Sequence, residues 1–205
     1  MLAKKKIIEI GSGSGFSKLY LKEKVILSDA TKNPWVDKYI DATKMDLPNH
    51  SVDILIASHN IHHFYSPYKF FNEANRVLKK GGLLLIQEIN TSLLMRILLK
   101  IMRHEGWSYE VNVFHAKEIV NDKDDLWSAN CAVPEMLFSN EKKFIQTFPF
   151  FEFKKNTLNE CLIFPFSGGV ISKTKIPELP LFFLKLLDFI DNILIYFFPK
   201  VFALG

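Results

Sequence analysis

The chain has little of what disulfide scaffolds, zinc sites and nucleic-acid surfaces need. Among its 205 residues there are only two cysteines, Cys131 and Cys161, and they lie far apart. This usage is typical of a reducing compartment and excludes a disulfide framework. No C-x-x-C pair occurs, and we expect no metal site. The net charge is only +4 with scattered lysines, so we expect no nucleic-acid partner.

Targeting signals and internal repeats are also lacking. Lys4–Lys6 precede an apolar run of four residues, which is far too short for a signal peptide. We therefore expect a cytoplasmic protein. Apolar residues make up 48% of the chain, including 19 phenylalanines, which is enough to fill a sizeable core.

The most informative stretch is residues 7–15, which read Ile-Ile-Glu-Ile-Gly-Ser-Gly-Ser-Gly. An apolar run followed by glycines on alternate positions is typical of a strand that enters a turn close to a ligand. The dinucleotide pattern G-x-G-x-x-G and the phosphate loop G-x-x-x-x-G-K-[ST] both fail at Phe16. What remains is E-x-G-x-G-x-G, from Glu9 to Gly15.

Strands and helices alternate over the first 90 residues. Apolar runs predict strands over residues 6–10, 25–29, 38–41, 52–58 and 83–88. Helices are expected over residues 14–22 and 67–80, the second capped by Ser66 and stopped by Gly81 and Gly82. This alternation predicts a doubly wound, Rossmann-like α/β fold with a mostly parallel sheet of order 3-2-1-4-5. Beyond it we expect helices over 92–102 and 134–148, a strand over 150–158 and a helical C-terminal cover.

Ligands of an open parallel sheet bind beyond the carboxyl ends of its strands. Four predicted strands end in candidate ligand residues. These are the glycines from Gly11 to Gly15, Asp29, the pair Asp41-Ala42, and the run Ser58-His59-Asn60. An acid at the position of Asp29 can accept both hydroxyls of a ribose. The sequence therefore predicts a nucleoside site at this edge of the sheet.

Several motifs follow one another over residues 7–88. They are Glu9–Gly15, Asp29, Asp41-Ala42 with Asp46-Leu-Pro48, Ser51-Val-Asp53, Ile61-His-His63 and Arg76-Val-Leu-Lys-Lys-Gly-Gly82. This series resembles the type 11 group of class I S-adenosylmethionine-dependent methyltransferases. Three later stretches are similar, less specifically, to a bacterial branch whose genes often sit among those for cell-surface polysaccharides. They are His104-Glu105, Trp127-Ser-Ala-Asn130 and Ser167-Gly-Gly169.

The resemblance implies a cofactor site. Glu9 would orient the glycine loop and meet the methionine amino group, Asp29 would bind the ribose, and Asp41 would accept from the adenine amino group. The full set of implied S-adenosylmethionine residues is Glu9, Gly11, Ser12, Gly13, Gly15, Asp29, Ala30, Asp41, Ala42, Ser58 and His59. The chain departs from the family in two ways. The usual N-terminal helix is missing before the first strand, and no antiparallel strand pair is found after residue 158.

Candidate catalytic residues are fewer. A neutral imidazole is a natural general base. Adjacent side chains point in different directions, so at most one of His62 and His63 should face the cavity, and the resemblance favours His63. Packing beneath the site is the alternative role for His63. His104 and Glu105 lie in the variable region that should cover the acceptor pocket, where a His–Glu pair could activate a hydroxyl.

Residues 181–198 are almost entirely Leu, Phe, Ile and Tyr. Their charges, Lys185, Asp188 and Asp191, fall at spacings of three on one narrow helical stripe. These three charges argue against a membrane-spanning helix. Three environments are left for this segment: the body of the domain, a homodimer interface, or a membrane surface.

The sequence thus predicts a methyltransferase domain over residues 1–160, with an acceptor-covering insertion at about 91–130, and an apolar helical appendage over 161–205. The expected function is methyl transfer from S-adenosylmethionine to a small-molecule or glycan-like acceptor, leaving S-adenosylhomocysteine. The alternatives are a non-catalytic S-adenosylmethionine-binding accessory protein and a nicotinamide-dependent reductase, against which Phe16 speaks.

Overall fold

A five-stranded parallel sheet organises the chain, whose computed structural model describes residues 5–15, 17–21, 24–103, 105–125, 127–166 and 179–205. The strand order is β3-β2-β1-β4-β5, which confirms the predicted doubly wound topology. The strands are β1 (Ile7–Ile10), β2 (Val25–Asp29), β3 (Lys38–Tyr39), β4 (Val52–Ser58) and β5 (Leu78–Gln87). Parallel neighbours on both sides explain the apolar run in β1, since Ile8 pairs with Ile26 of β2 and Leu55 of β4.

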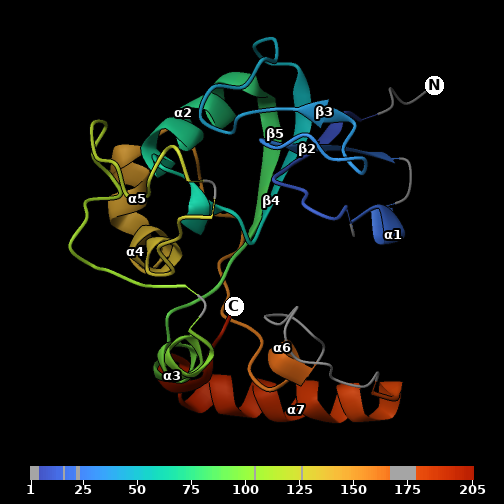
Figure 1. Cartoon of the computed structure of the whole chain (residues 1–205), viewed down its shortest axis with the longest axis vertical. Coiled ribbons are helices and arrows are strands. Elements are labelled where there is room, and N and C mark those ends of the chain that lie inside the picture. Colours follow the sequence, from blue (N-terminus) through green and yellow to red (C-terminus); the bar gives the residue numbers. More distant parts are fainter. Residues whose placement is uncertain (1–4, 16, 22–23, 104, 126, 167–178) are drawn as a thin grey trace.

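The main hydrophobic core lies on one face of the sheet, where α2 (Pro67–Val77), α4 (Val133–Phe138) and α5 (Glu141–Thr147) gather (Figure 1). The short helix α1 (Ser17–Leu21) lies on the other side. Much of the phenylalanine content is used in this core. Phe71 of α2 meets Phe144 of α5 edge to face, with ring centroids 4.9 Å apart, and Phe148 also lies 4.9 Å away. As predicted, Ser66 caps α2 and accepts a hydrogen bond from the Lys69 backbone N–H.

The structure corrects the predicted end of α2. The helix ends at Val77, and residues 78–82 already belong to β5 rather than to the helix and its stop. The two glycines lie in a bulge of that strand, because Val52 pairs with Leu78 whereas Ile54 pairs with Leu83. Gly81 has φ +73, the left-handed backbone that such a bulge requires.

Two further predictions beyond residue 130 are wrong. The helix expected over 134–148 is divided between α4 and α5, because the side chain of Asn140 accepts from the Lys143 backbone N–H and starts a new helix. Residues 150–158 form no strand, although their hydrophobic residues alternate. Phe151 and Phe153 instead pack against the phenylalanine-rich core. Among the described residues the sheet therefore ends at β5, along which runs an open groove of about 2020 Å³.

A second layer lies below the sheet in Figure 1 and contains α3 (Leu93–Met102), α6 (Ile163–Phe166), α7 (Leu181–Phe197) and α8 (Pro199–Phe202). Its small core includes Met95 and Leu99 of α3, Phe164 and Leu204. Leu204 also ties the end of the chain to the sheet, since its carbonyl accepts from the Asn90 N–H and its N–H donates to the Glu160 carbonyl. The two layers thus share a backbone connection just beyond β5.

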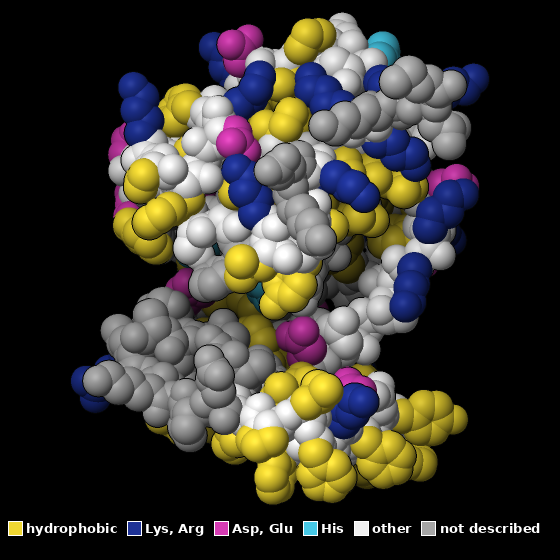
Figure 2. All heavy atoms as spheres, turned by 90° about the vertical axis from the view of Figure 1, so that its right-hand side faces the viewer, with side chains coloured by type: hydrophobic (Ala, Val, Ile, Leu, Met, Phe, Trp, Pro, Cys, Tyr) yellow, Lys and Arg dark blue, Asp and Glu magenta, His cyan; other side chains and the backbone are white. Residues whose placement is uncertain are grey.

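The long helix α7 packs on the molecule with only one of its faces. Asp191 on that face is 2% exposed. Large apolar side chains on the outer face are exposed, among them Phe182 at 72%, Phe189 at 64% and Tyr196 at 81%. Figure 2 shows the hydrophobic side chains that gather on this lower part of the molecule. No described helix is both long and apolar enough to cross a membrane.

Arg76 has a structural role that can be tested. Its guanidinium donates to the carbonyls of Met45 and Leu47, each at 2.7 Å, and pairs with Glu73 at 2.7 Å, so it fixes the loop before β4. We expect Arg76→Ala to lower the free energy of unfolding in urea by about 1.5–3 kcal/mol, the range for hydrogen bonds to charged groups. Lys80→Ala, an exposed position on β5, is the matched control and should leave stability nearly unchanged.

The same ion pair gives the effect of Arg76→Ala a pH dependence. The hydrogen bond from Arg76 holds the pKa of Glu73 below its usual 4.5. A carboxylate with a lowered folded-state pKa stabilises the protein above its unfolded pKa and loses that contribution as the pH falls through the folded value. The stability difference between wild type and Arg76→Ala should therefore shrink below pH 4.5. A difference that grows in acid would contradict this role.

Candidate functional site

The glycine loop after β1 uses backbone conformations that side chains rarely adopt. Gly11, Gly13 and Gly15 have φ values of +64°, +49° and +75°. A Cβ atom at Gly11 would lie 2.5 Å from Nδ2 of Asn60, and one at Gly15 would lie 2.7 Å from Leu27. At Gly13 there is open space on the Cβ side. All three positions therefore favour glycine because of their backbone conformation, and Gly11 and Gly15 also need it because a Cβ atom would collide with a neighbour.

Hydrogen bonds from neighbouring strand ends hold this loop in place. The Ser12 backbone N–H donates to the Ser28 carbonyl at 2.9 Å, and the Ser28 N–H donates to Ser12 Oγ at 3.0 Å. Ser28 Oγ donates in turn to the Glu9 carbonyl at 2.6 Å. The Glu9 carboxylate accepts from Ser17 Oγ at the start of α1. Burial raises the pKa of Glu9 above its ordinary value, although its serine partners act in the opposite direction.

Asp29 lies at the end of β2, beside the glycine loop. Its Oδ2 accepts from the Gly13 N–H at 3.0 Å, and its Oδ1 accepts from the backbone and hydroxyl of Thr31 at 2.8 and 2.7 Å. The carboxylate is thus fixed by the turn that follows it. Asp41 is fixed in the same way, because its Oδ1 accepts from the backbone and hydroxyl of Thr43, both at 2.7 Å.

An open cleft of about 760 Å³ lies over the glycine loop and the ends of β4 and β5. It brings together six of the residues that the resemblance implies: Glu9, Gly11, Ser12, Gly13, Ser58 and His59. Asp29 borders the cleft through Gly13, and Asp41 and Ala42 follow the neighbouring strand β3. Gly15, Ala30, Asp41 and Ala42 do not line the cleft. Tyr20, Leu85 and Gln87 also line it, although the sequence analysis gave them no role.

Asn60 lies directly against the glycine loop. Its Nδ2 donates to the Ile10 carbonyl, while its buried Oδ1 has no hydrogen-bond partner among the described residues. A buried polar atom without a partner is costly, and such atoms often mark the place of a ligand group. The glycine loop, the acids Glu9 and Asp29, and this oxygen together suit a small ligand that carries an ammonium group and hydroxyls.

Comparison with known proteins places this site in a family. Residues 8–86 match the model of the family described as a methyltransferase domain, and this range contains the glycine loop, Asp29, Asp41 and the cleft residues of β4 and β5 up to Ile86. The strand order 3-2-1-4-5 fits the same assignment. This part of the chain, which is less than half of it, is thus similar to a class I methyltransferase domain. No curated protein matches the chain.

One solved structure shows the same fold over nearly the whole chain. A SAM-dependent methyltransferase from Archaeoglobus fulgidus superposes with a TM-score of 0.58 at 17% identity, over 98% of this chain and 82% of that one. The YcgJ protein from Bacillus subtilis reaches a TM-score of 0.40 at 24% identity, over 50% of this chain and 51% of that one. The trans-methyltransferase CalH, solved with SAH, reaches 0.37 at 18% identity, over 42% of this chain. Several matches are partial, since the matched part spans only 32% of CalH and 28% of a citrinin polyketide synthase CMeT domain.

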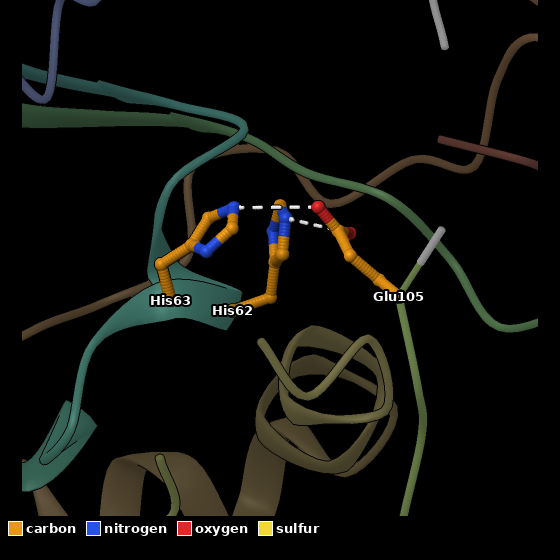
Figure 3. Close-up of side chains that lie close together, drawn as sticks. All are labelled: His62, His63 and Glu105. Carbon is orange, nitrogen blue, oxygen red and sulfur yellow. Dashed lines mark ion pairs between the residues drawn. The ribbon is translucent and has the colours of Figure 1, made fainter. Parts of the chain in front are cut away.

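A cluster of histidines and carboxylates lies next to the cleft of this methyltransferase domain. A short 3-10 helix, η2 (Ile61–His63), follows β4 and presents His62 and His63 toward Glu105 (Figure 3). His62 Nδ1 lies 2.6 Å from Oε2 of Glu88, and His62 Nε2 lies 3.6 Å from Glu105. His63 Nε2 lies 3.7 Å from the other oxygen of Glu105. The sequence-predicted residues His63 and Glu105 are thus brought together, while His104 lies outside the described residues.

The electrostatics of the two histidines differ. Burial lowers the pKa of His62, but the carboxylates of Glu88 and Glu105 outweigh burial and raise it overall. For His63, burial and the neighbouring His62 lower the pKa. Burial also raises the pKa of Glu88, yet its pairing with His62 and its bonds from backbone N–H groups lower it overall. The cluster therefore holds a buried ionic pair, His62 with Glu88, beside a neutral His63.

Sequence reasoning missed Glu88 as a site residue, named Asn60 only as part of the run after the fourth strand, and treated His62 only as the neighbour of His63. Glu88 Oε1 accepts from the N–H groups of Asn60 and Ile61, so it fixes the start of η2. The rule that located Asp29 could have found Glu88, because it stands at the carboxyl end of the fifth strand.

Proposed function

We propose that this chain transfers a methyl group from S-adenosylmethionine to an acceptor bound beside the cleft. The observation that carries the proposal is the cleft itself, in which Glu9, the glycine loop, Ser58 and His59 meet at adjacent strand ends. Its residues fit the cofactor, because buried Oδ1 of Asn60 and the Glu9 carboxylate can accept from an ammonium group. In this assignment Asp29 accepts from the ribose hydroxyls, and Asp41 accepts from the adenine amino group with Ala42 at the ring edge.

The bound cofactor supplies an activated methyl group on sulfur, and the chain supplies alignment and the exclusion of water. Alignment of the two reactants at near-attack distance can lower a barrier by roughly 7–11 kcal/mol. The rigid loop suits this role, since its position is fixed by Ser28, Asp29 and Asn60. The glycine loop would therefore hold the cofactor in place for methyl transfer without a large rearrangement.

We propose that the acceptor is a small molecule or a glycan-like molecule with a hydroxyl group. His63, which is neutral and lies beside Glu105, would take the hydroxyl proton as methyl transfer proceeds. A positioned base contributes typically about 10²–10⁴-fold when the nucleophile is a hydroxyl. We further propose that the chain belongs to the bacterial branch associated with cell-surface polysaccharides. Residues at about 91–130 would cover the bound acceptor.

The test of the cofactor assignment is Asp29→Ala. We expect the dissociation constant of S-adenosylhomocysteine, measured by calorimetry, to rise tenfold or more, because the mutant loses the ribose acceptor and the bond to Gly13. Asp124→Ala, an exposed acid outside the matched domain, is the matched control and should bind as wild type does. An unchanged constant in Asp29→Ala would refute the ribose assignment.

A non-catalytic role as an S-adenosylmethionine-binding accessory protein is the competing proposal. It would show tight cofactor binding in the wild type and no turnover with any acceptor. For the exposed face of α7 we keep the two proposals of a homodimer and of peripheral contact with the inner face of a membrane. Sedimentation would detect the first, and flotation with anionic vesicles would detect the second.

A further inference from the structure

The side chains of His62, His63 and Glu105 converge on one point. The nitrogen Nε2 of each histidine faces one oxygen of the Glu105 carboxylate, at 3.6 and 3.7 Å (Figure 3). One ligand atom from each of the three residues lies within 4.8 Å of the others. With metal bonds of 2.0–2.2 Å, tetrahedral zinc ligands lie about 3.4 Å apart, so only small side-chain shifts separate these atoms from coordination.

Each of the three side chains also has a hydrogen-bond partner outside the cluster of three that fixes its orientation. His62 Nδ1 is 2.6 Å from Glu88, and His63 Nδ1 is 3.2 Å from the Ser128 carbonyl, so Nδ1–H donates in both rings and Nε2 faces the site. His62, which is charged without metal, would bind the ion through Nε2 with release of the proton on that nitrogen. The Cys131 thiol donates to Glu105 at 3.3 Å. Outer-shell partners of this kind orient the ligands of protein metal sites.

We propose that His62, His63 and Glu105 bind a divalent transition-metal ion of the zinc type. Two imidazoles and one carboxylate are the ligands of several catalytic zinc and non-haem iron sites, which keep a further position open. The site is closed on the His62 side, whose side chain is 4% exposed, and reachable past His63 and Glu105, which are 24% and 17% exposed. The sequence analysis expected no metal site, so this proposal departs from it.

The ion would act on the acceptor rather than on the cofactor. His59 lines the cofactor cleft and η2 follows it after one residue, so the ion would lie on the acceptor side of the site. A hydroxyl bound to such an ion loses its proton more readily. Because Nε2 of His63 cannot bind an ion and a proton together, His63 is a ligand in the metal-loaded chain and a base only without metal.

Metal binding can be measured without knowing the acceptor. The full chain, free of any histidine tag, is stripped with a chelator and titrated with Zn²⁺ and, separately, with Co²⁺. Metal content is determined after gel filtration, and the Co²⁺ sample is followed by its visible absorption. We expect one ion per folded chain, a thermal unfolding midpoint raised by Zn²⁺, and Co²⁺ bands typical of nitrogen and oxygen ligands.

The variants His63→Gln and Glu105→Gln should lose the bound ion and the Zn²⁺-dependent rise in the midpoint. His115→Gln and Glu110→Gln remove the same residue types at exposed positions and should keep both. Circular dichroism checks that each variant folds, and we avoid substituting His62 because it is buried against Glu88. Folded wild type that takes up no ion, or equal uptake by Glu105→Gln, would overturn the proposal. The cluster would then be an ion pair of His62 with two carboxylates, and the base proposal for His63 would be unaffected.

Discussion

Replacing Gly11 by alanine is expected to weaken the binding of S-adenosylhomocysteine about 100-fold or to abolish it. The new Cβ would lie 2.5 Å from Nδ2 and 3.0 Å from Cβ of Asn60. Asn60 cannot move away cheaply, since it is 7% exposed and its Nδ2 is bound to the Ile10 carbonyl. A positive φ costs an alanine about 1–2 kcal/mol, and overpacking adds about 1–3 kcal/mol. The sum is about 2–5 kcal/mol, and a loop that shifts to avoid this cost populates its binding conformation roughly 30- to 5,000-fold less, which weakens binding by the same factor.

Gly13→Ala is the matched control for this effect. Gly13 also has a positive φ, +49°, but nothing lies within 4 Å of its ideal Cβ position. It should therefore show the backbone cost without the collision and bind the ligand more tightly than Gly11→Ala does. Calorimetric titration gives both constants, and circular dichroism shows whether each variant is folded. Equal binding by the two variants would contradict the contact between Gly11 and Asn60.

Asp191→Ala is expected to lower the free energy of unfolding by about 3 kcal/mol or more. Asp191 is 2% exposed, and its carboxylate accepts from the backbone N–H groups of Cys161, Leu162 and Ile163 at 2.8, 2.7 and 2.9 Å. Its removal leaves three donors without their charged acceptor, and each buried donor left unpaired costs about 1–3 kcal/mol. Urea unfolding measures the loss, and hydrogen exchange at residues 161–163 should show where it occurs.

Asp188→Ala is the control on the same helix. Asp188 is exposed on the polar stripe of α7, so its removal should change stability by less than about 0.5 kcal/mol. If both variants were equally stable, the carboxylate of Asp191 would not be what fastens α7 to α6. The hydrogen bonds from residues 161–163 thus explain why α7 has an acid on its packed face.

The sheet was predictable because its signals are local. Each strand is a short apolar run, and strand order follows from right-handed crossovers and the glycine turn. The two wrong predictions beyond residue 130, a single helix over 134–148 and a strand over 150–158, have causes that such local signals do not show. Asn140 starts a second helix inside an apolar pattern, and residues 150–158 alternate but are drawn into the phenylalanine-rich core rather than paired with β5.

Many of the cleft residues could be predicted from the sequence, and their binding of a cofactor stays a prediction, whereas the meeting of His62, His63 and Glu105 at one point was not predicted. Glu9, Asp29 and Ser58 follow from their places at strand ends, a rule that holds for all open parallel sheets. Glu105, although a candidate in its own right, and Cys131 reach the cluster from segments far from His62 in sequence, so no spacing motif shows that they meet. The pairing of His62 with Glu88 likewise joins two strand ends across 26 residues.

The outer face of α7 shows a different limit. The periodicity of residues 181–198 places Lys185, Asp188 and Asp191 on one narrow stripe, yet it could not tell which of these charges is buried or which apolar face is packed. The structure separates them, because Phe182, Phe189 and Tyr196 are exposed while Asp191 is buried. This apolar surface is large enough to expect a second contact there.

The central claim is that the cleft beside the glycine loop binds S-adenosylmethionine. Its most direct test is calorimetric titration of the wild-type chain with S-adenosylhomocysteine, with NADH as the control ligand. We predict micromolar binding of S-adenosylhomocysteine and no binding of NADH. Binding of neither ligand, or of NADH alone, would contradict the account.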